Sequence, residues 1–161
     1  MGIDVYLRWN VQTQGELAAQ EEAYMALDGG SVGYLREWYT GGLYLMKILC
    51  REAFESGSRR ATIPAAVLRG RLTSVTEPAR GLDYGHHIAD VVAKELEEGG
   101  AAVRRPGFPR TDPMNVEEAV AARYADQPEL LQAVLKSRRD FVALAENKER
   151  GTGLPCTIVL A

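Results

Sequence analysis

The chain has 161 residues, of which 46% are hydrophobic and 25% are charged. This composition is typical of a globular protein and excludes a chain that is disordered along its whole length. A chain of this length buries enough surface for one hydrophobic core, so we expect a single domain over residues 1–161. The formal net charge of −3 argues against a general nucleic-acid binder, which needs surplus lysine and arginine to contact phosphates.

The first third of the chain predicts two strands and two helices. Residues 3–9 alternate apolar and polar side chains, which is typical of a half-buried β-strand. Residues 13–27 begin with the spacing of a capping box and predict a helix. Residues 32–39 lie between two glycine pairs and predict a strand, although they could also begin a helix. Residues 43–54 carry apolar side chains at helical spacing and predict the next helix.

The middle of the chain predicts short helices and one irregular segment. Pro64 marks the start of a helix, and residues 86–98 predict a helix that ends at a glycine pair. Asn115 caps a short helix over residues 116–124. Residues 104–113 contain three prolines and predict a surface loop, because proline excludes regular structure there.

A long helix and a last strand complete the predicted elements. Residues 128–150 carry one apolar stripe, with Arg138 and Arg139 at its outer margins. Residues 155–160 are rich in β-branched side chains and predict a strand. We expect this strand to lie beside the strand at residues 3–9, so that both chain ends join one sheet.

These elements predict an α+β fold with a small sheet of two or three strands, including both chain ends, packed against five or six helices. The predicted core draws on apolar side chains from both ends and from the long helix. Its members are Val5, Leu7, Leu35, Leu45, Leu49, Leu131, Leu135, Val142 and Ile158.

Arg36 and the glycines that follow it are one candidate site. If a helix begins after Gly41 and Gly42, its free amides could hold an anion, and Arg36 could bind a phosphate or carboxylate beside Tyr39. The spacing matches neither the dinucleotide fingerprint nor the P-loop. We favour the alternative of a glycine turn with aromatic side chains in the core. Asp4 could also pair with Arg36 or Arg8 across the sheet, as a surface ion pair.

The two histidines are the second candidate. His86 and Asp90 are one turn apart on a predicted helix, and Asp83 could pair with His87. Such a pair could act as a general base or as half of a metal site. We favour the alternative in which Asp83 caps the helix and Asp90 is solvated. Because the chain has no cysteine or histidine spacing typical of metal sites, we predict no metal and no cofactor.

Basic side chains near the proline-rich segment are a third candidate. Together with Phe108, they could form a positive patch that contacts single-stranded nucleic acid. A solvated loop and a solvated helix face explain them equally well, and the acidic net charge disfavours nucleic acid as a partner. The residues are Arg104, Arg105, Arg110, Lys136, Arg138 and Arg139.

The remaining features concern reactivity and location. Cys50 and Cys156 lie in predicted apolar elements, so we expect them to be reduced and buried rather than catalytic. There is no Gly-x-Ser-x-Gly motif for serine catalysis. Neither a long apolar run nor a signal-peptide pattern is present, which predicts a cytoplasmic protein without a membrane partner.

Three segments resemble a group of short uncharacterised bacterial proteins, some of them from prophages. The segments are residues 2–9, 33–37 and 153–158, which touch both ends and the middle of the chain. The group has no assigned activity. The resemblance therefore implies a bacterial or phage setting and assigns no catalytic residue.

Two classes of function follow. The first, which we favour, is a non-enzymatic binding or protein-interaction domain, with a homodimer as one form. The second is a small enzyme, or a protein that binds a small anion such as phosphate, with a pocket near Arg36 and His86. The candidate ligand-binding residues are Tyr6, Arg36, Tyr39, Gly41, Gly42, His86 and Asp90.

Overall fold

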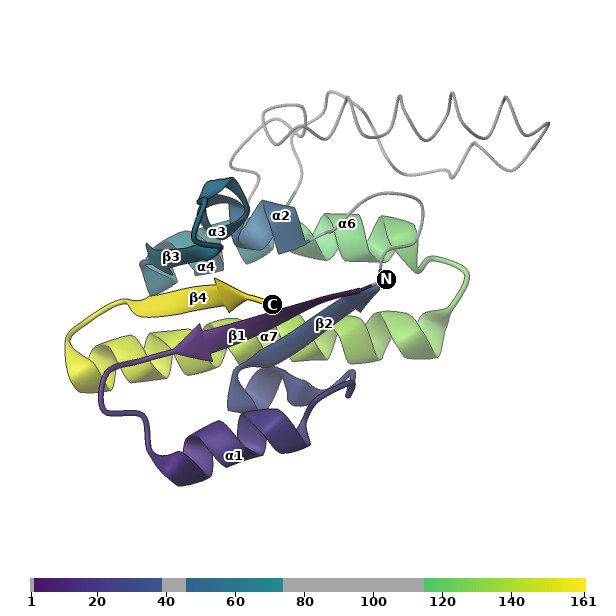
Figure 1. Cartoon of the computed structure of the whole chain (residues 1–161). Helices are drawn as coiled ribbons and strands as arrows, with labels where there is room; N and C mark the ends of the chain where they lie inside the picture. The colour runs from purple at the N-terminus through teal and green to yellow at the C-terminus, as the bar shows by residue number, and fades with distance from the viewer. Residues whose placement is uncertain (1, 39–45, 74–114) are drawn as a thin grey trace.

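The strands form one antiparallel sheet, and most of the helices pack on one of its faces (Figure 1). A computed structural model of the chain describes residues 2–38, 46–73 and 115–161. In spatial order the strands are β2 (Tyr34–Trp38), β1 (Gly2–Arg8), β4 (Cys156–Leu160) and β3 (Arg60–Ile63). The predicted α+β class is confirmed, but the sheet has four strands where the sequence predicted two or three.

The predicted pairing of the two chain ends is confirmed. β1 and β4 run antiparallel, with Val5 opposite Leu160 and Leu7 opposite Ile158. Asp4 and Ala161 exchange backbone hydrogen bonds of 3.1 and 2.9 Å. The two ends of the chain therefore form the centre of the sheet, and Figure 1 shows the termini close together.

The strand that sequence analysis missed is β3. It has four residues, and only Ile63 among them is fully buried. Such a short segment carries too little alternation to be recognised from periodicity. Its extended conformation comes from pairing with β4, in which Ala61 lies opposite Ile158.

Two predicted helix starts are confirmed in atomic detail. At the start of α1 (Gln14–Glu22), the Thr13 hydroxyl accepts a 3.1 Å hydrogen bond from the Glu16 amide. Asn115 accepts an equivalent 2.8 Å bond from Glu118. The other described helices are η1 (Gly29–Val32, a 3-10 helix), α2 (Met46–Leu49), α3 (Arg51–Glu55), α4 (Ala65–Thr73), α6 (Val116–Arg123) and α7 (Pro128–Thr152). The predicted helix at residues 86–98 and loop at residues 104–113 lie outside the described residues.

Tertiary contacts shorten two predicted helices. The helix expected to reach residue 27 ends at Glu22, and the Met25 amide donates a 2.9 Å hydrogen bond to the Tyr34 hydroxyl. The single helix expected over residues 43–54 is divided into α2 and α3. At this break, the Arg71 guanidinium donates a 3.2 Å hydrogen bond to the Leu49 carbonyl. The Ala53 amide donates instead to the Cys50 carbonyl.

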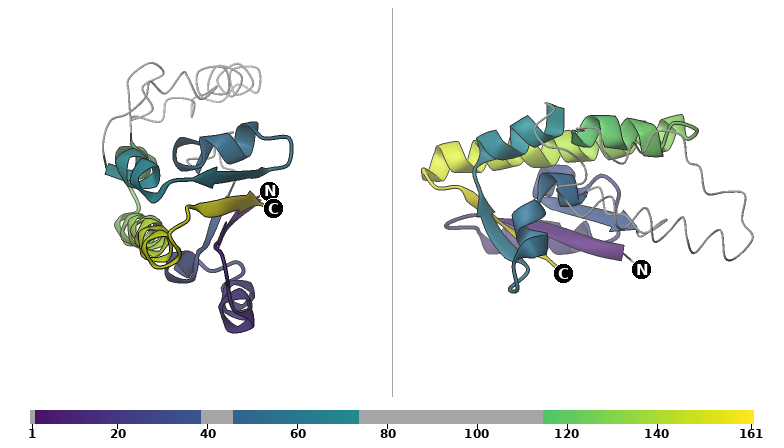
Figure 2. Two further views of the ribbon diagram at one scale, coloured as in Figure 1. Left: turned by 90° about the vertical axis from the view of Figure 1, so that its left-hand side faces the viewer. Right: turned by 90° about the horizontal axis from the view of Figure 1, so that it is seen from above.

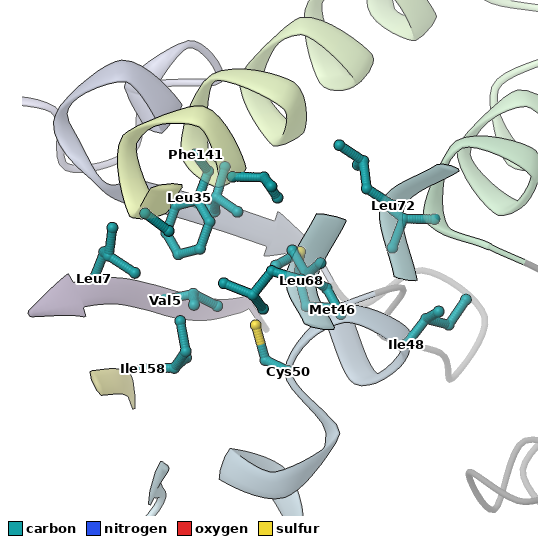
Figure 3. Close-up of a cluster of buried hydrophobic side chains, with 14 of the residues drawn as sticks. Val5, Leu7, Leu35, Met46, Ile48, Cys50, Leu68, Leu72, Phe141 and Ile158 are labelled. Carbon is teal, nitrogen blue, oxygen red and sulfur yellow. The ribbon is translucent and has the colours of Figure 1, made fainter. Parts of the chain in front are cut away.

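The core lies between the inner face of the sheet and the helices (Figure 3). Seven of the nine predicted core residues are buried: Val5, Leu7, Leu35, Leu49, Leu135, Val142 and Ile158. Leu131 is partly buried against the cluster. Leu45 lies outside the described residues. The core therefore forms largely from the apolar stripes that the sequence shows.

Arg138 corrects the prediction for the long helix. The sequence placed it at the outer margin of the stripe, yet the side chain is only 2% exposed. Its neighbour Arg139 is exposed and pairs with Glu117 at 2.5 Å. The apolar stripe on α7 thus includes a buried cation, which periodicity alone does not reveal.

The sheet has two different faces. Figure 2 shows α4, α6 and α7 on one side of the sheet. The buried side chains of the strands belong to the core shared with these helices. α1 lies at one margin of the opposite side, which we call the outer face. Among the described helices, none combines the length and the apolar composition that crossing a bilayer requires.

Candidate functional site on the outer face of the sheet

The outer face carries the side chains that alternate with the core residues of each strand. Strand pairing arranges them in rows across the sheet. Tyr34 lies opposite Tyr6, Tyr6 opposite Val159, and Val159 opposite Arg60. A second row contains Arg8, Thr157 and Thr62, and the two threonine hydroxyls are 3.2 Å apart.

Asp4 organises the polar group at the β2 side of the outer face. Its carboxylate accepts two hydrogen bonds from Arg36 Nη1, at 2.7 and 2.9 Å. It also accepts a 2.6 Å bond from the Tyr34 hydroxyl. The Arg36 guanidinium lies 5.6 Å from the centre of the Tyr24 ring. The predicted pairing of Asp4 with Arg36 is confirmed, although both side chains are largely covered rather than at the surface.

The pairing of Arg36 with Asp4 affects the predicted binding of an anion at Arg36. Hydrogen bonding to Asp4 is the main cause that raises the pKa of Arg36, which keeps the guanidinium charged. The Asp4 carboxylate already occupies a position that a ligand carboxylate or phosphate would take. In this structure Arg36 serves to join β2 to β1, and an external anion would compete with Asp4.

Tyr6 and Arg8 lie at the centre of the outer face. The Tyr6 ring contacts the Tyr34 ring at a centroid distance of 5.3 Å, and the Arg8 guanidinium lies 5.0 Å from its centre. Partial burial, followed by the charge of Asp4, raises the pKa of Tyr6. Partial burial lowers the pKa of Arg8, and the neighbouring positive charge of Arg60 adds to this effect. Tyr6 is therefore a neutral contact surface flanked by arginines.

The opposite side of the outer face is more accessible. In the described part of the chain, no helix covers the outer side of β4 and β3 (Figure 2). Val159 and Thr157 are half-buried, whereas Arg60 and Thr62 are exposed. This surface combines an aliphatic side chain, hydroxyls and a positive charge, a mixture that suits contact with another protein.

Two of the seven predicted ligand-binding residues fall within the described part. Tyr6 and Arg36 share the outer face, one on each side of the Asp4–Tyr34 contact. Tyr39, Gly41, Gly42, His86 and Asp90 lie outside the described residues. The structure therefore brings Tyr6 and Arg36 to one face, and the predicted pocket near Arg36 and His86 stays a prediction.

A second polar group, which the sequence analysis missed, lies inside the core. The Glu37 carboxylate accepts from the Met46 amide at 2.8 Å and from Arg123 at 3.4 Å. The charge of Glu37 also acts on Arg138, whose pKa is lowered mainly by complete burial. Arg138 Nε is buried without a hydrogen-bond partner in the described structure. Among the described residues, Arg123 and Arg138 thus lie near the Glu37 carboxylate, an arrangement that no local sequence pattern indicates.

The structure differs from the predicted basic patch in two ways. Arg138 cannot contribute to a surface patch because it is buried. Lys136 and Arg139 are exposed but pair with Asp140 and Glu117 at 2.6 and 2.5 Å. Arg104, Arg105 and Arg110, which the prediction placed in the same patch, lie outside the described residues. On α7, positive charge is therefore mostly paired with carboxylates.

The cysteines are buried and free, as predicted. Burial raises the pKa of Cys50 far above its usual value and that of Cys156 to about 11, so both thiols stay protonated near neutral pH. The described residues include no group of three or more histidine, cysteine, aspartate or glutamate side chains that could hold a metal ion.

Comparisons with protein-family models, with curated proteins and with solved structures found no match for this chain. Its functional interpretation therefore follows from the geometry of the outer face.

Proposed function

We propose that this chain is a non-enzymatic protein-interaction domain that binds its partner across the outer face of the sheet. One observation carries the proposal: the row formed by Tyr6, Val159 and Arg60 spans three strands and stays accessible while the inner face is buried. Tyrosine and arginine are enriched at protein interfaces, where both supply large contact areas and hydrogen bonds.

The polar network beside this row supports the same function. Asp4, Tyr34 and Arg36 bond to one another, and Tyr34 also bonds to the backbone at Met25. These contacts hold the strands and the segment after α1 in one arrangement. A rigid, pre-organised surface binds a partner with less loss of conformational entropy than a loop would. The network therefore fixes the shape of the surface that the partner contacts.

Site-specific photo-crosslinking tests the proposal. The photoreactive residue p-benzoylphenylalanine would replace Tyr6 in one variant and Gln132, an exposed residue on α7, in a matched control. We expect a protein adduct from position 6, in the purified chain or in an extract of the source cells, and none from position 132. Introducing Arg60→Glu should remove the adduct at position 6.

Either of two outcomes would contradict the proposal. One is the absence of any adduct at position 6 under conditions in which both variants are folded. The other is the same adducts at both positions, which would indicate random collision rather than a specific surface.

A further inference from the structure

We infer that the partner on the outer face is a second copy of this chain, related to the first by a two-fold axis that lies in the interface and runs parallel to the strands. This inference rests on the proposed function, because it names the partner of the same surface. It is carried by charges of opposite sign at opposite margins of the outer face, which form no ion pair within the described part of the chain.

The basic margin is the turn between α3 and β3. Arg59 and Arg60 are both exposed there, and neither has an ion-pair or hydrogen-bond partner among the described side chains. The turn is held by a 3.0 Å backbone bond from Arg59 to Ser56. Arg8, at the centre of the face, donates a hydrogen bond to the Gln20 side chain of α1, and the charges of both Arg60 and Glu21 act on it. Arg59 and Arg60 therefore give this margin a positive charge, and neither forms an ion pair with a described carboxylate.

The acidic margin is the end of α1. Glu21 and Glu22 are exposed, and neither forms an ion pair with a described residue. The helix is fixed to the sheet by the buried Gln20 side chain, which donates to the carbonyls of Leu7 and Gly33 at 2.9 and 3.2 Å. Since α1 cannot move freely, its carboxylates stay at this margin of the outer face.

The two margins have the placement that a two-fold dimer requires. In Figure 2, α1 and the turn before β3 both project toward the outer side of the sheet, from opposite margins. The strand order β2-β1-β4-β3 separates the outermost strands by three strand spacings, or about 14 Å. A two-fold axis in the interface, parallel to the strands and between β1 and β4, places Arg59 and Arg60 of each copy against Glu21 and Glu22 of the other. Tyr6 of each copy then lies opposite Val159 of the other, near the axis.

A second copy fits this surface better than a nucleic acid does. The Tyr6 ring is already in contact with Tyr34 and with the Arg8 guanidinium, so it is not a bare platform for a stacked base. Glu21 and Glu22 would repel phosphates at one margin. A second copy supplies both charges that the face lacks, because the same two margins are present on it.

Analytical ultracentrifugation of charge-reversed chains tests the inference. The wild-type chain should sediment as a dimer that dissociates on dilution and at high salt. The variants R59E/R60E and E21K/E22K should each dimerise about tenfold or more weakly, because like charges would then face each other across the interface. The four-fold variant R59E/R60E/E21K/E22K restores opposite charges and should recover the wild-type dimerisation constant. Thermal unfolding would verify that every chain is folded.

Matched controls reverse charges away from the outer face. Arg150→Glu at the end of α7 and Glu129→Lys at its beginning change the net charge in the same directions at exposed positions. Both control chains should dimerise as the wild type does.

The inference is overturned if the wild-type chain is monomeric at every accessible concentration, or if reversing either margin leaves dimerisation unchanged. It is also overturned if the four-fold variant stays as weak as the two-fold variants. A monomeric chain that still gives a specific adduct to another protein from position 6 would reject the homodimer while leaving the interaction function in place. No specific adduct at position 6 would reject both.

Discussion

Tyr34 joins three parts of the chain through one hydroxyl group. That hydroxyl donates to Asp4 on β1 and accepts from the Met25 amide in the segment after α1. The side chain itself is completely buried, although the residue belongs to the outer face. Burial, together with the hydrogen bond to Asp4, raises the pKa of Tyr34 to about 12 from a usual 10.0.

This pKa predicts a loss of stability in alkali. Because the folded state holds the Tyr34 proton more tightly than the unfolded state, the free energy of unfolding should fall as the pH rises from about 10 to about 12. Tyr34→Phe should reduce that fall. It should also lower stability by about 1 kcal/mol below pH 10, because Asp4 and the Met25 amide each lose a partner.

Denaturant unfolding of both chains at several alkaline pH values measures this effect. Tyr24→Phe is the matched control, since Tyr24 is exposed, and it should keep the pH dependence of the wild type. An equally steep fall in Tyr34→Phe would show that another group is responsible.

The buried cluster of Glu37, Arg123 and Arg138 is the second residue-scale feature. Burying the charged groups of Glu37, Arg123 and Arg138 carries a desolvation cost that well-packed apolar side chains avoid. Glu37 reduces this cost by accepting from Arg123 and from the Met46 amide. The cluster thereby connects β2, α2 and α6, so these polar groups specify how the elements meet at this point of the core.

At the scale of elements, the contact between η1 and α7 depends on a glycine. A Cβ added at Gly30 would lie 1.8 Å from the Ser137 carbonyl oxygen, which is far inside van der Waals contact. The Gly30 amide donates a 3.1 Å hydrogen bond to the Ser137 hydroxyl. Backbone therefore packs directly against backbone, and only glycine leaves room for it.

We expect Gly30→Ala to separate these two elements. The free energy of unfolding should fall by about 1–3 kcal/mol or more, because the added methyl group overpacks a rigid contact. Gly151→Ala near the end of α7 is the control, since an added Cβ meets nothing within 4 Å there; it should be neutral or slightly stabilising. Thermal unfolding of the two variants measures both effects. A Gly30→Ala chain as stable as the wild type would contradict the close packing.

At the scale of the whole molecule, the last strand holds the sheet together. β4 pairs with β1 on one side and with β3 on the other, and it supplies three buried side chains, Cys156, Ile158 and Leu160. Removing it would leave β3 without a neighbouring strand and expose the edge of β1.

Deletion of residues 155–161 should therefore abolish cooperative unfolding. Circular dichroism during heating would show a gradual loss of signal in the truncated chain and a sharp transition in the full chain. Ile158→Ala, which keeps the strand but removes part of its core contact, should instead unfold cooperatively with a loss of about 2–5 kcal/mol. A truncated chain that melts as sharply and at the same temperature as the full chain would refute this role of β4.

Some features of this protein follow from the sequence by itself. The α+β class, both terminal strands, the two capping boxes and most of the core could be predicted, because each depends on a local pattern. Alternation along β1, the stripe on α7, and the pairs Thr13–Glu16 and Asn115–Glu118 are examples. In such cases the nearest neighbours in the chain determine the conformation.

Other features were decided only by the tertiary structure. β3 is extended because β4 lies beside it, and the break between α2 and α3 comes with a bond from Arg71 to Leu49. On the outer face, Tyr6 and Arg36 could be predicted from the sequence as candidate site residues. Val159 and Arg60 lie in the same site only because of the register in which the strands pair. These features depend on contacts between residues that are far apart in the chain. A local sequence pattern contains no information about the energies of such contacts.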